Sequence, residues 1–262
     1  AKNIARQNKI AVYCWRGGQR SNSMGWLLGN AGFEVTVLPG GYKAYRNHIH
    51  DFFAQKINIQ IVGGETGSGK TDILKHLADA GDQVIDLEAI ANHRGSSFGA
   101  LGLPAQPSVE QFENNLHQAL CMKDPHKPLW MEDESRSIGR VYIPEPIWKQ
   151  MLDAPIFRIS IPRHVRIERL VKEYGLFTTE ELTDAIMRIK KRLGDLATRE
   201  ALDALQRNDL NETALIALKY YDKAYNHNHA VKNFRNIHFI SSETADPNEN
   251  ATKIRTFVQN LR

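Results

Sequence analysis

A cysteine near the start of the chain lies in a loop whose residues suit a reactive thiol. Cys14 ends the apolar run at residues 9–14, and the loop WRGGQRS leads from it into a predicted helix. Amide groups of such a loop, together with the positive end of the helix dipole, stabilise a thiolate and lower the pKa of the thiol. We therefore predict that Cys14 is a catalytic nucleophile.

The loop after Cys14 is also predicted to bind an oxyanion. Its amide and guanidinium donors come from Arg16, Gly17, Gly18 and Arg20. The spacing from Cys14 to Arg20 is C-x5-R, the arrangement with which cysteine phosphatases hold a phosphoryl group. The other cysteine, Cys121, falls within a predicted helix, where we expect it to be a small buried apolar residue.

A second anion-binding loop follows another predicted strand. The run GGETGSGKT contains the pattern G-x-x-x-x-G-K-T and leads into a predicted helix, so that successive backbone N–H groups can surround a phosphate. Lys70 is expected to bridge terminal phosphates and the Thr71 hydroxyl to bind Mg²⁺. The residues predicted to bind a diphosphate or a nucleotide are Gly64, Gly67, Ser68, Gly69, Lys70 and Thr71.

Acidic side chains at the end of a third predicted strand provide a partner for Thr71. The run PLWMEDES places three carboxylates there, and Asp133 is the one that we expect to bind Mg²⁺ or its water. Loops at this edge of an α/β sheet commonly bind ligands. The candidate substrate-binding residues are His93, Arg94, Asp133 and Arg136.

These loops must be positioned by strands and helices that alternate along the chain. Residues 1–54 read as strand, helix, strand and helix, which is only part of an α/β module. Residues 55–262 repeat a βα pattern, which predicts an α/β fold with a parallel sheet and helices on both faces. Residues from 163 to about 231 read as almost wholly helical, so we expect a P-loop domain with a helical insertion or extension.

Composition and charge narrow the kind of partner. The 262 residues are 42% hydrophobic and 24% charged and include only two cysteines, which favours a cytoplasmic globular protein without disulfides. No apolar run is long enough to span a membrane. The net charge is +6 over residues 1–50, −6 over residues 51–155 and +4 over residues 156–192, which favours a polyanionic partner. His227 and His229, near a helix end, are expected to be surface residues rather than metal ligands.

The two loops together resemble a particular pair of domains. YCWRGGQRS followed by LPGGYKAYR resembles the C-terminal half of a rhodanese domain, in which a cysteine loop precedes a glycine pair and an aromatic residue. A rhodanese half joined to a P-loop domain is similar to the tRNA 2-selenouridine synthase family. The stretches DLEAIANHRGSSFG, EDESRSIG and RLGDL support the same resemblance, which covers nearly the whole chain.

The resemblance implies a tRNA-modifying transferase that acts on wobble 2-thiouridine. In that reaction a geranyl group would first be transferred from geranyl diphosphate to the sulfur, and selenophosphate would then supply selenium. In this chain the P-loop would hold the diphosphate, Phe98 or Trp130 would line a pocket for the geranyl tail, and Cys14 would carry selenium as a perselenide. An alternative role for some basic residues of the stretch 156–192 is to close over the phosphate ligand. The residues expected to contact tRNA are Arg163, Arg166, Arg169, Arg188, Lys190, Lys191 and Arg192.

Only thirteen residues precede Cys14, fewer than a complete rhodanese domain has, so we expect a truncated form of such an enzyme. Two other functions fit the same residues. One is a cysteine-dependent sulfurtransferase or phosphatase with a regulatory P-loop, although Tyr13 stands where such phosphatases usually carry a histidine. The other is a kinase-like P-loop protein that binds RNA.

Overall fold

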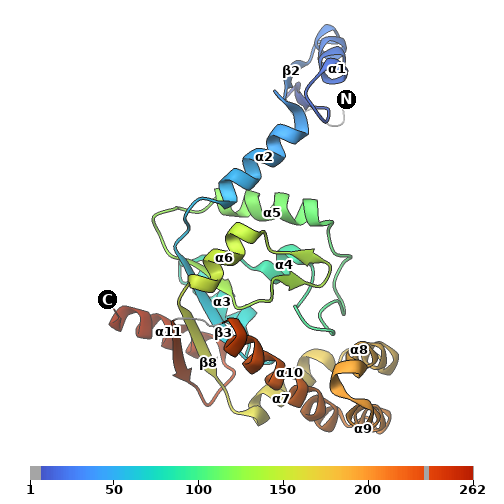
Figure 1. The fold of residues 1–262 in the computed structure, drawn as a ribbon, viewed down its shortest axis with the longest axis vertical. Helices are drawn as coiled ribbons and strands as arrows, with labels where there is room; N and C mark the ends of the chain where they lie inside the picture. Colours follow the sequence, from blue (N-terminus) through green and yellow to red (C-terminus); the bar gives the residue numbers. More distant parts are fainter. Residues whose placement is uncertain (1–6, 233–235, 262) are drawn as a thin grey trace. The chain divides into compact units, whose positions relative to one another are not determined.

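The computed structural model describes residues 7–232 and 236–261, with side chains omitted for residues 228–232 (Figure 1). The chain divides into two compact units, Ala1–Gln55 and Lys56–Arg262, one residue beyond the boundary expected from the sequence. Each unit is described separately below.

The first unit contains two parallel strands and two helices. Strand β1 (Lys9–Val12) pairs with β2 (Glu34–Val37), and the strands are joined by helix α1 (Gln19–Asn30). Helix α2 (Gly41–Phe53) follows β2. Gly25 lets α1 approach the sheet closely, because a Cβ atom there would come within 2.9 Å of Val37.

Glycines allow the cysteine loop and the start of α2 to lie backbone against backbone. Gly17 and Gly41 both have φ of +63°, and a Cβ atom on Gly41 would lie 2.1 Å from the Cys14 carbonyl oxygen. The amide of Tyr42 donates to that carbonyl at 3.0 Å, and the amide of Lys43 donates to the carbonyl of Trp15 at 2.9 Å. The glycine pair Gly40–Gly41 at the start of α2 therefore supports the loop that carries Cys14.

The second unit is built on a five-stranded parallel sheet, which confirms the predicted α/β fold. The strand order is β4-β5-β3-β8-β9, with all neighbouring strands parallel. The strands are β3 (Ile59–Gly64), β4 (Gln83–Val84), β5 (Leu129–Glu132), β8 (Ile156–Ser160) and β9 (Ile237–Ser241). The P-loop follows the central strand β3, and the acidic run ends the adjacent strand β5.

Helices cover both faces of this sheet. Helices α3 (Lys70–Asp79) and α11 (Pro247–Asn260) pack on one face, in a core that includes Val62, Leu77 and Ile254. Helix α6 (Glu145–Asp153) contacts β3 from the other face, towards which the alternation of the strand turns Ile61. Helix α5 (Val109–Cys121) packs beside α4 (Leu87–Ala91).

Residues 163–232 form four helices, as the predicted helical segment requires. These are α7 (Arg163–Tyr174), α8 (Thr179–Leu193), α9 (Asp195–Gln206) and α10 (Leu210–Lys232). Helices α8, α9 and α10 pack together around a separate apolar core (Figure 1). Thr178 begins α8 with a capping box, in which its hydroxyl and the side chain of Glu181 satisfy each other's backbone amides. None of the helices in the described ranges is long and apolar enough to cross a membrane.

Two elements differ from the sequence prediction. The apolar run QVIDL predicts a strand over residues 83–87. Strand β4 instead ends at Val84, because the Asp86 carboxylate accepts a hydrogen bond from the Ala89 amide and begins helix α4. A short hairpin of β6 (Ser137–Ile138) and β7 (Val141–Tyr142), turning at Gly139, also went unpredicted.

Candidate phosphate-binding site and cysteine loop

The P-loop wraps from the end of β3 into the first turn of α3. Gly67 and Gly69 have φ of +82° and +81°, which a side chain would strain. The Lys70 ammonium donates to the Gly64 carbonyl at 3.0 Å, and the Gly64 amide donates to the Tyr225 hydroxyl at 2.9 Å. The Ser68 hydroxyl is buried and has no hydrogen-bond partner among the described residues. The loop therefore has the form of a cradle for phosphate.

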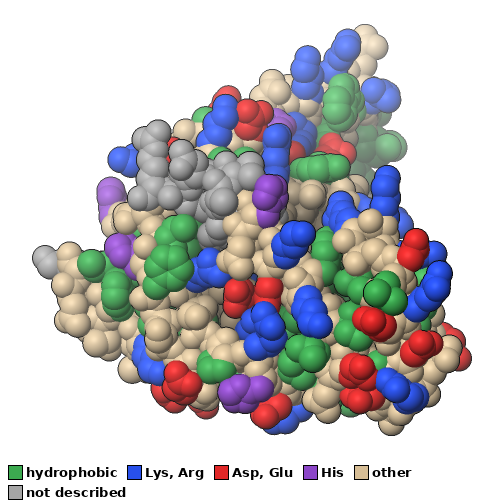
Figure 2. Space-filling view, turned by 60° about the horizontal axis from the view of Figure 1, so that its bottom comes forward, with side chains coloured by type: hydrophobic (Ala, Val, Ile, Leu, Met, Phe, Trp, Pro, Cys, Tyr) green, Lys and Arg blue, Asp and Glu red, His purple; other side chains and the backbone are tan. Residues whose placement is uncertain are grey.

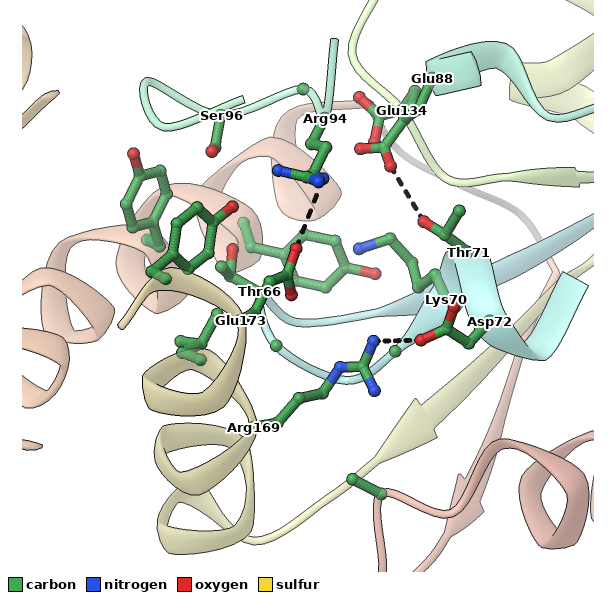
Figure 3. A pocket seen from close by; sticks show the side chains of 18 of the residues that line it. Thr66, Lys70, Thr71, Asp72, Glu88, Arg94, Ser96, Glu134, Arg169 and Glu173 are labelled. Atoms are coloured by element: carbon green, nitrogen blue, oxygen red, sulfur yellow. Dashed lines mark hydrogen bonds and ion pairs between the residues drawn. The ribbon is translucent and has the colours of Figure 1, made fainter. Parts of the chain in front are cut away.

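A cluster of three carboxylates, Glu88, Glu132 and Glu134, lies at the end of the P-loop. Figure 3 shows two of them, Glu88 and Glu134, near Thr71. The Thr71 hydroxyl donates to Glu88 at 2.9 Å and lies 3.4 Å from Glu132, whose other oxygen accepts from the Glu88 amide at 2.9 Å. One oxygen from each of Glu88, Glu132 and Glu134 falls within 4.8 Å of the others. Sequence reasoning placed Glu132 and Glu134 at this edge but missed Glu88, which reaches Thr71 only because α4 forms.

Burial and mutual repulsion disfavour ionisation of this cluster. Burial, followed by the charge of Glu88, raises the pKa of Glu134 to about 8 and raises that of Glu132 well above its ordinary value. Burial is also the main cause that raises the pKa of Glu88. A hydroxyl oxygen and several carboxylate oxygens are ligands of the kind that Mg²⁺ prefers, so the donor set of Thr71 and the cluster fits this ion.

Asp133, the predicted Mg²⁺ ligand, lines the pocket into which the P-loop opens. The hydroxyl of Tyr225 interacts with it, and the pKa of Tyr225 is raised first by burial and then by the Asp133 charge. The Thr71 hydroxyl instead meets Glu88 and Glu132.

The P-loop opens into a pocket of about 1210 Å³. Its walls also include α7, α10 and the loop after α4. Two ion pairs start from α7: Glu173 pairs with Arg94 of that loop at 3.4 Å, and Arg169 pairs with Asp72 of α3 (Figure 3). Arg169 lies against the P-loop, since a Cβ atom on Gly69 would be 3.4 Å from its guanidinium carbon. Arg169 is therefore placed to contact a phosphate in the cradle.

A smaller apolar pocket of about 60 Å³ adjoins the large one. Phe98, Leu182 and Leu218 are among its lining residues, and Thr66 and Tyr174 line both pockets. Phe98 thus lies where an apolar ligand could be held. Trp130 does not line this pocket, because it packs against Phe157 in the core beside α3, with ring centroids 5.3 Å apart.

The other two candidate substrate-binding residues, His93 and Arg136, do not line the large pocket. His93 accepts a hydrogen bond from the Gly95 amide at 3.1 Å, and burial followed by the charge of Arg188 lowers its pKa. Arg136 is half-exposed and lies 3.9 Å from Glu145.

The seven basic residues expected to contact tRNA occupy different environments. Arg166 is only 3% exposed and makes two hydrogen bonds, of 2.8 and 3.0 Å, to Asp222, so the structure contradicts a surface role for it. Arg163 also pairs with Asp222, at 3.5 Å, and Lys190 pairs with Asp195 at 3.4 Å. Lys191 is exposed. Basic and acidic side chains are intermixed on the face that Figure 2 shows.

Two of these arginines extend from α8 towards the loop and helix that flank the large pocket. Arg188 donates to the Ser97 carbonyl at 3.2 Å, and Arg192, which lines the pocket, donates to the Tyr220 hydroxyl at 3.4 Å. Both arginines are exposed. His227 is exposed near the end of α10, and the side chain of His229 lies outside the described residues.

The cysteine loop of the first unit stabilises a thiolate through hydrogen bonds. The sulfur of Cys14 lies 3.4 Å from the Ser21 hydroxyl and accepts from the Gly18 amide at 3.3 Å. These contacts, Ser21 first, lower the pKa of Cys14 to about 6. Arg16 contributes through its backbone, and the guanidinium groups of Arg16 and Arg20 are not among the causes.

Cys121 is not the buried apolar residue that we expected. It is exposed at the last position of α5, with its sulfur 3.4 Å from Nε2 of His117. Leu116 and Leu120 form the buried side of this part of the helix, and the next residue, Cys121, points away from that side.

The parallel sheet and the P-loop motif together define a P-loop α/β domain, and comparison with known proteins identifies its family. The family described as tRNA 2-selenouridine synthase AAA domain matches residues 57–249. The chain is 36% identical to a tRNA 2-selenouridine synthase of Aeromonas salmonicida, over 85% of this chain and 68% of that protein. It is 35% identical to the enzyme of the same name from Sulfurovum, over 86% of this chain and 69% of that protein. The chain belongs to the tRNA 2-selenouridine synthase family.

Among solved structures, the chain is similar to a tRNA isopentenylpyrophosphate transferase from Bacillus halodurans, with a TM-score of 0.44 and 11% identity. The match covers 78% of this chain and 96% of that protein.

Proposed function

We propose that the chain is a tRNA-modifying transferase that converts 2-thiouridine to 2-selenouridine through an S-geranyl intermediate. The observation that carries the proposal is the adjacency of two pockets, one beginning in a phosphate cradle and the other apolar, with Thr66 and Tyr174 in the walls of both. A prenyl diphosphate has the same two parts, an anionic head and an apolar tail.

In the first step the sulfur of 2-thiouridine attacks C1 of geranyl diphosphate. The C1–O bond breaks, diphosphate leaves, and the uracil ring loses its N3 proton. The P-loop amides, Lys70 and Arg169 are placed to stabilise the charge that develops on the leaving diphosphate. Mg²⁺, held by Thr71 with carboxylates of the cluster, would add positive charge at the same place.

The apolar pocket has room for only part of the geranyl tail. Its volume of about 60 Å³ is smaller than the roughly 150 Å³ cavity that holds benzene in an engineered protein, so it suits only part of a ten-carbon chain. The remaining carbons would lie in the larger pocket, along Tyr174 and Leu170, which line both.

In the second step selenium replaces the geranylated sulfur. A perselenide on Cys14 would require an added oxidant, because selenium in selenophosphate is already at the selenide level. The balanced step begins with attack of the Cys14 thiolate on phosphorus: the P–Se bond breaks, selenide displaces geranylthiolate from C2, and water hydrolyses the S–P bond. The low pKa of Cys14 and its contact with the Gly18 amide support this role.

The test uses RNA stem-loops that carry either 2-thiouridine or uridine, with geranyl diphosphate as donor. We expect geranylated nucleoside and released diphosphate only with the 2-thiouridine RNA, measured by nucleoside mass spectrometry and a diphosphate assay. The absence of geranyl transfer to either RNA would contradict the proposed function.

A further inference from the structure

Four tyrosines line the large pocket, and three of them have hydroxyl groups held by its walls. Tyr225 accepts from the Gly64 amide at 2.9 Å, and Tyr221 accepts from the Ser97 amide at 3.2 Å. The hydroxyl of Tyr174 interacts with the side chain of Ser96. These three rings are therefore parts of the wall.

The fourth tyrosine, Tyr220, makes a different contact. Its hydroxyl accepts a hydrogen bond of 3.4 Å from Arg192, and both residues line the pocket. Such a long bond from an exposed guanidinium is weak, so little is lost when Arg192 turns to another acceptor. The Tyr220 ring lies 5.0 Å from that of Tyr221, at an angle of 59°, and the contact helps to hold it in place.

Arg192 also differs from other cations of the pocket in its charge balance. Arg94 is paired with Glu173, and both Arg169 and Lys75 are paired with Asp72. Within residues 7–232 and 236–261, no carboxylate lies within ion-pair distance of Arg192 in the structure. A guanidinium with no carboxylate partner at a pocket wall suits an incoming phosphate.

We propose that Tyr220 and Arg192 bind one nucleotide of the RNA substrate, with its base stacked on the Tyr220 ring and a neighbouring phosphate paired with Arg192. This inference rests on the proposed function, which makes a uridine in RNA the acceptor. Single-stranded RNA is bound in this way because every base has a face that stacks on an aromatic ring and every nucleotide brings a phosphate.

Tyr220 and Arg192 lie apart from the pocket proposed for the prenyl tail. Tyr174 and Tyr221 line both pockets, whereas Tyr220 and Arg192 line only the large one. The neighbouring Arg188, which donates to the Ser97 carbonyl, joins α8 to the loop that also binds Tyr221. Contacts among α8, α10 and the loop at Ser97 thus hold Tyr220 and Arg192 in the wall of the large pocket, and neither residue lines the apolar pocket.

The experiment measures the Kd of the full chain for a 2-thiouridine stem-loop by fluorescence anisotropy, without prenyl donor. We expect Tyr220→Ala to weaken RNA binding by about tenfold, since a stacked base contributes through the ring. Tyr220→Phe keeps the ring and should stay within about twofold of wild type. Arg192→Gln should weaken binding and reduce the slope of log Kd against log salt by about 0.7, the share of one phosphate contact on a single strand.

Two exposed residues that do not line the pocket serve as matched controls: Tyr142→Ala on β7 and Arg199→Gln on α9 should bind RNA as wild type does. The Kd for geranyl diphosphate should be unchanged in Tyr220→Ala. Wild-type RNA affinity in Tyr220→Ala, or an equal loss in Tyr142→Ala, would overturn the inference. A wild-type chain that bound RNA but transferred no geranyl group would contradict the proposed function and leave this inference standing.

Discussion

The Thr71 hydroxyl donates a hydrogen bond of 2.9 Å to Glu88, joining the first turn of the P-loop helix to the short helix α4. Glu132 lies behind this pair, completely buried, and Glu134 lies beside it. Ionising all three carboxylates in so small a space costs free energy, because the charges repel one another. The stability of the folded chain should therefore depend on pH.

Stability should fall as pH rises through the range in which Glu134 ionises. In the folded chain its pKa is about 8, whereas the unfolded chain ionises it near its ordinary value of 4.5. The folded state therefore binds the proton more tightly, and the stability that this confers is lost between about pH 4.5 and 8. We measure the free energy of unfolding of Glu134→Gln and of wild type by urea denaturation. The value for the variant minus that for wild type should be larger at pH 8 than at pH 5.

The control for this prediction is Glu145, which is exposed and whose pKa is lowered by Lys149. Glu145→Gln should show no gain at pH 8. An equal gain in both variants would mean that the buried cluster is not its source.

Cys14 should react as a thiolate at neutral pH. Hydrogen bonds from Ser21 and the Gly18 amide lower its pKa to about 6 from the ordinary 9.0. In a Cys121→Ser background, the rate of alkylation by iodoacetamide should increase with pH along a titration curve whose midpoint lies near pH 6. Ser21→Ala removes the largest cause and should move the midpoint upward. A midpoint that does not move would show that the hydroxyl does not stabilise the thiolate.

Arg166 should prove to be a structural residue. Arg166 forms a buried ion pair with Asp222. The Arg166 guanidinium also contacts the P-loop, where it donates a hydrogen bond to the Thr66 carbonyl at 3.1 Å. Removal of one partner from a buried pair typically costs about 3–5 kcal/mol. Arg166→Ala should lose that much free energy of unfolding, whereas the exposed Arg192→Ala should stay within about 0.5 kcal/mol of wild type. Equal stability of the two variants would contradict this distinction.

Ala214 should help to determine which prenyl donors fit. It lines the apolar pocket, and leucine in its place would fill space that the tail needs. Ala214→Leu should raise the KM for geranyl diphosphate by roughly tenfold or more relative to that for the shorter dimethylallyl diphosphate. Competition by inorganic diphosphate, which needs only the P-loop, should be unchanged. An equal rise in KM for both donors would argue against a tail in this pocket.

Much of the fold could be predicted because its signals are local. Apolar runs ended by glycine-rich turns located the central strand β3 and the P-loop, and the motif itself contains Lys70 and Thr71. The cysteine loop was equally legible, since its glycines and the following helix are contiguous in sequence.

The remaining site residues depend on contacts between distant segments. Arg166 and Arg192 look alike in a basic stretch, and only Asp222, 56 residues after Arg166, buries the first. Glu88 reaches Thr71 because the Asp86 cap replaces the end of a predicted strand with a helix. Trp130 and Phe98 are both aromatic, but the position of β5 inside the sheet puts Trp130 in the core.

The central claim is that the P-loop holds the prenyl diphosphate while Cys14 serves only the selenium step. The test incubates 2-thiouridine tRNA with geranyl diphosphate and then with selenophosphate, and analyses the nucleosides by mass spectrometry. It compares Lys70→Ala and Cys14→Ala with a control variant, Lys149→Ala, at an exposed position. Lys70→Ala should yield no geranylated nucleoside, whereas Cys14→Ala should accumulate it and form no 2-selenouridine. Wild-type geranylation by Lys70→Ala would contradict the account.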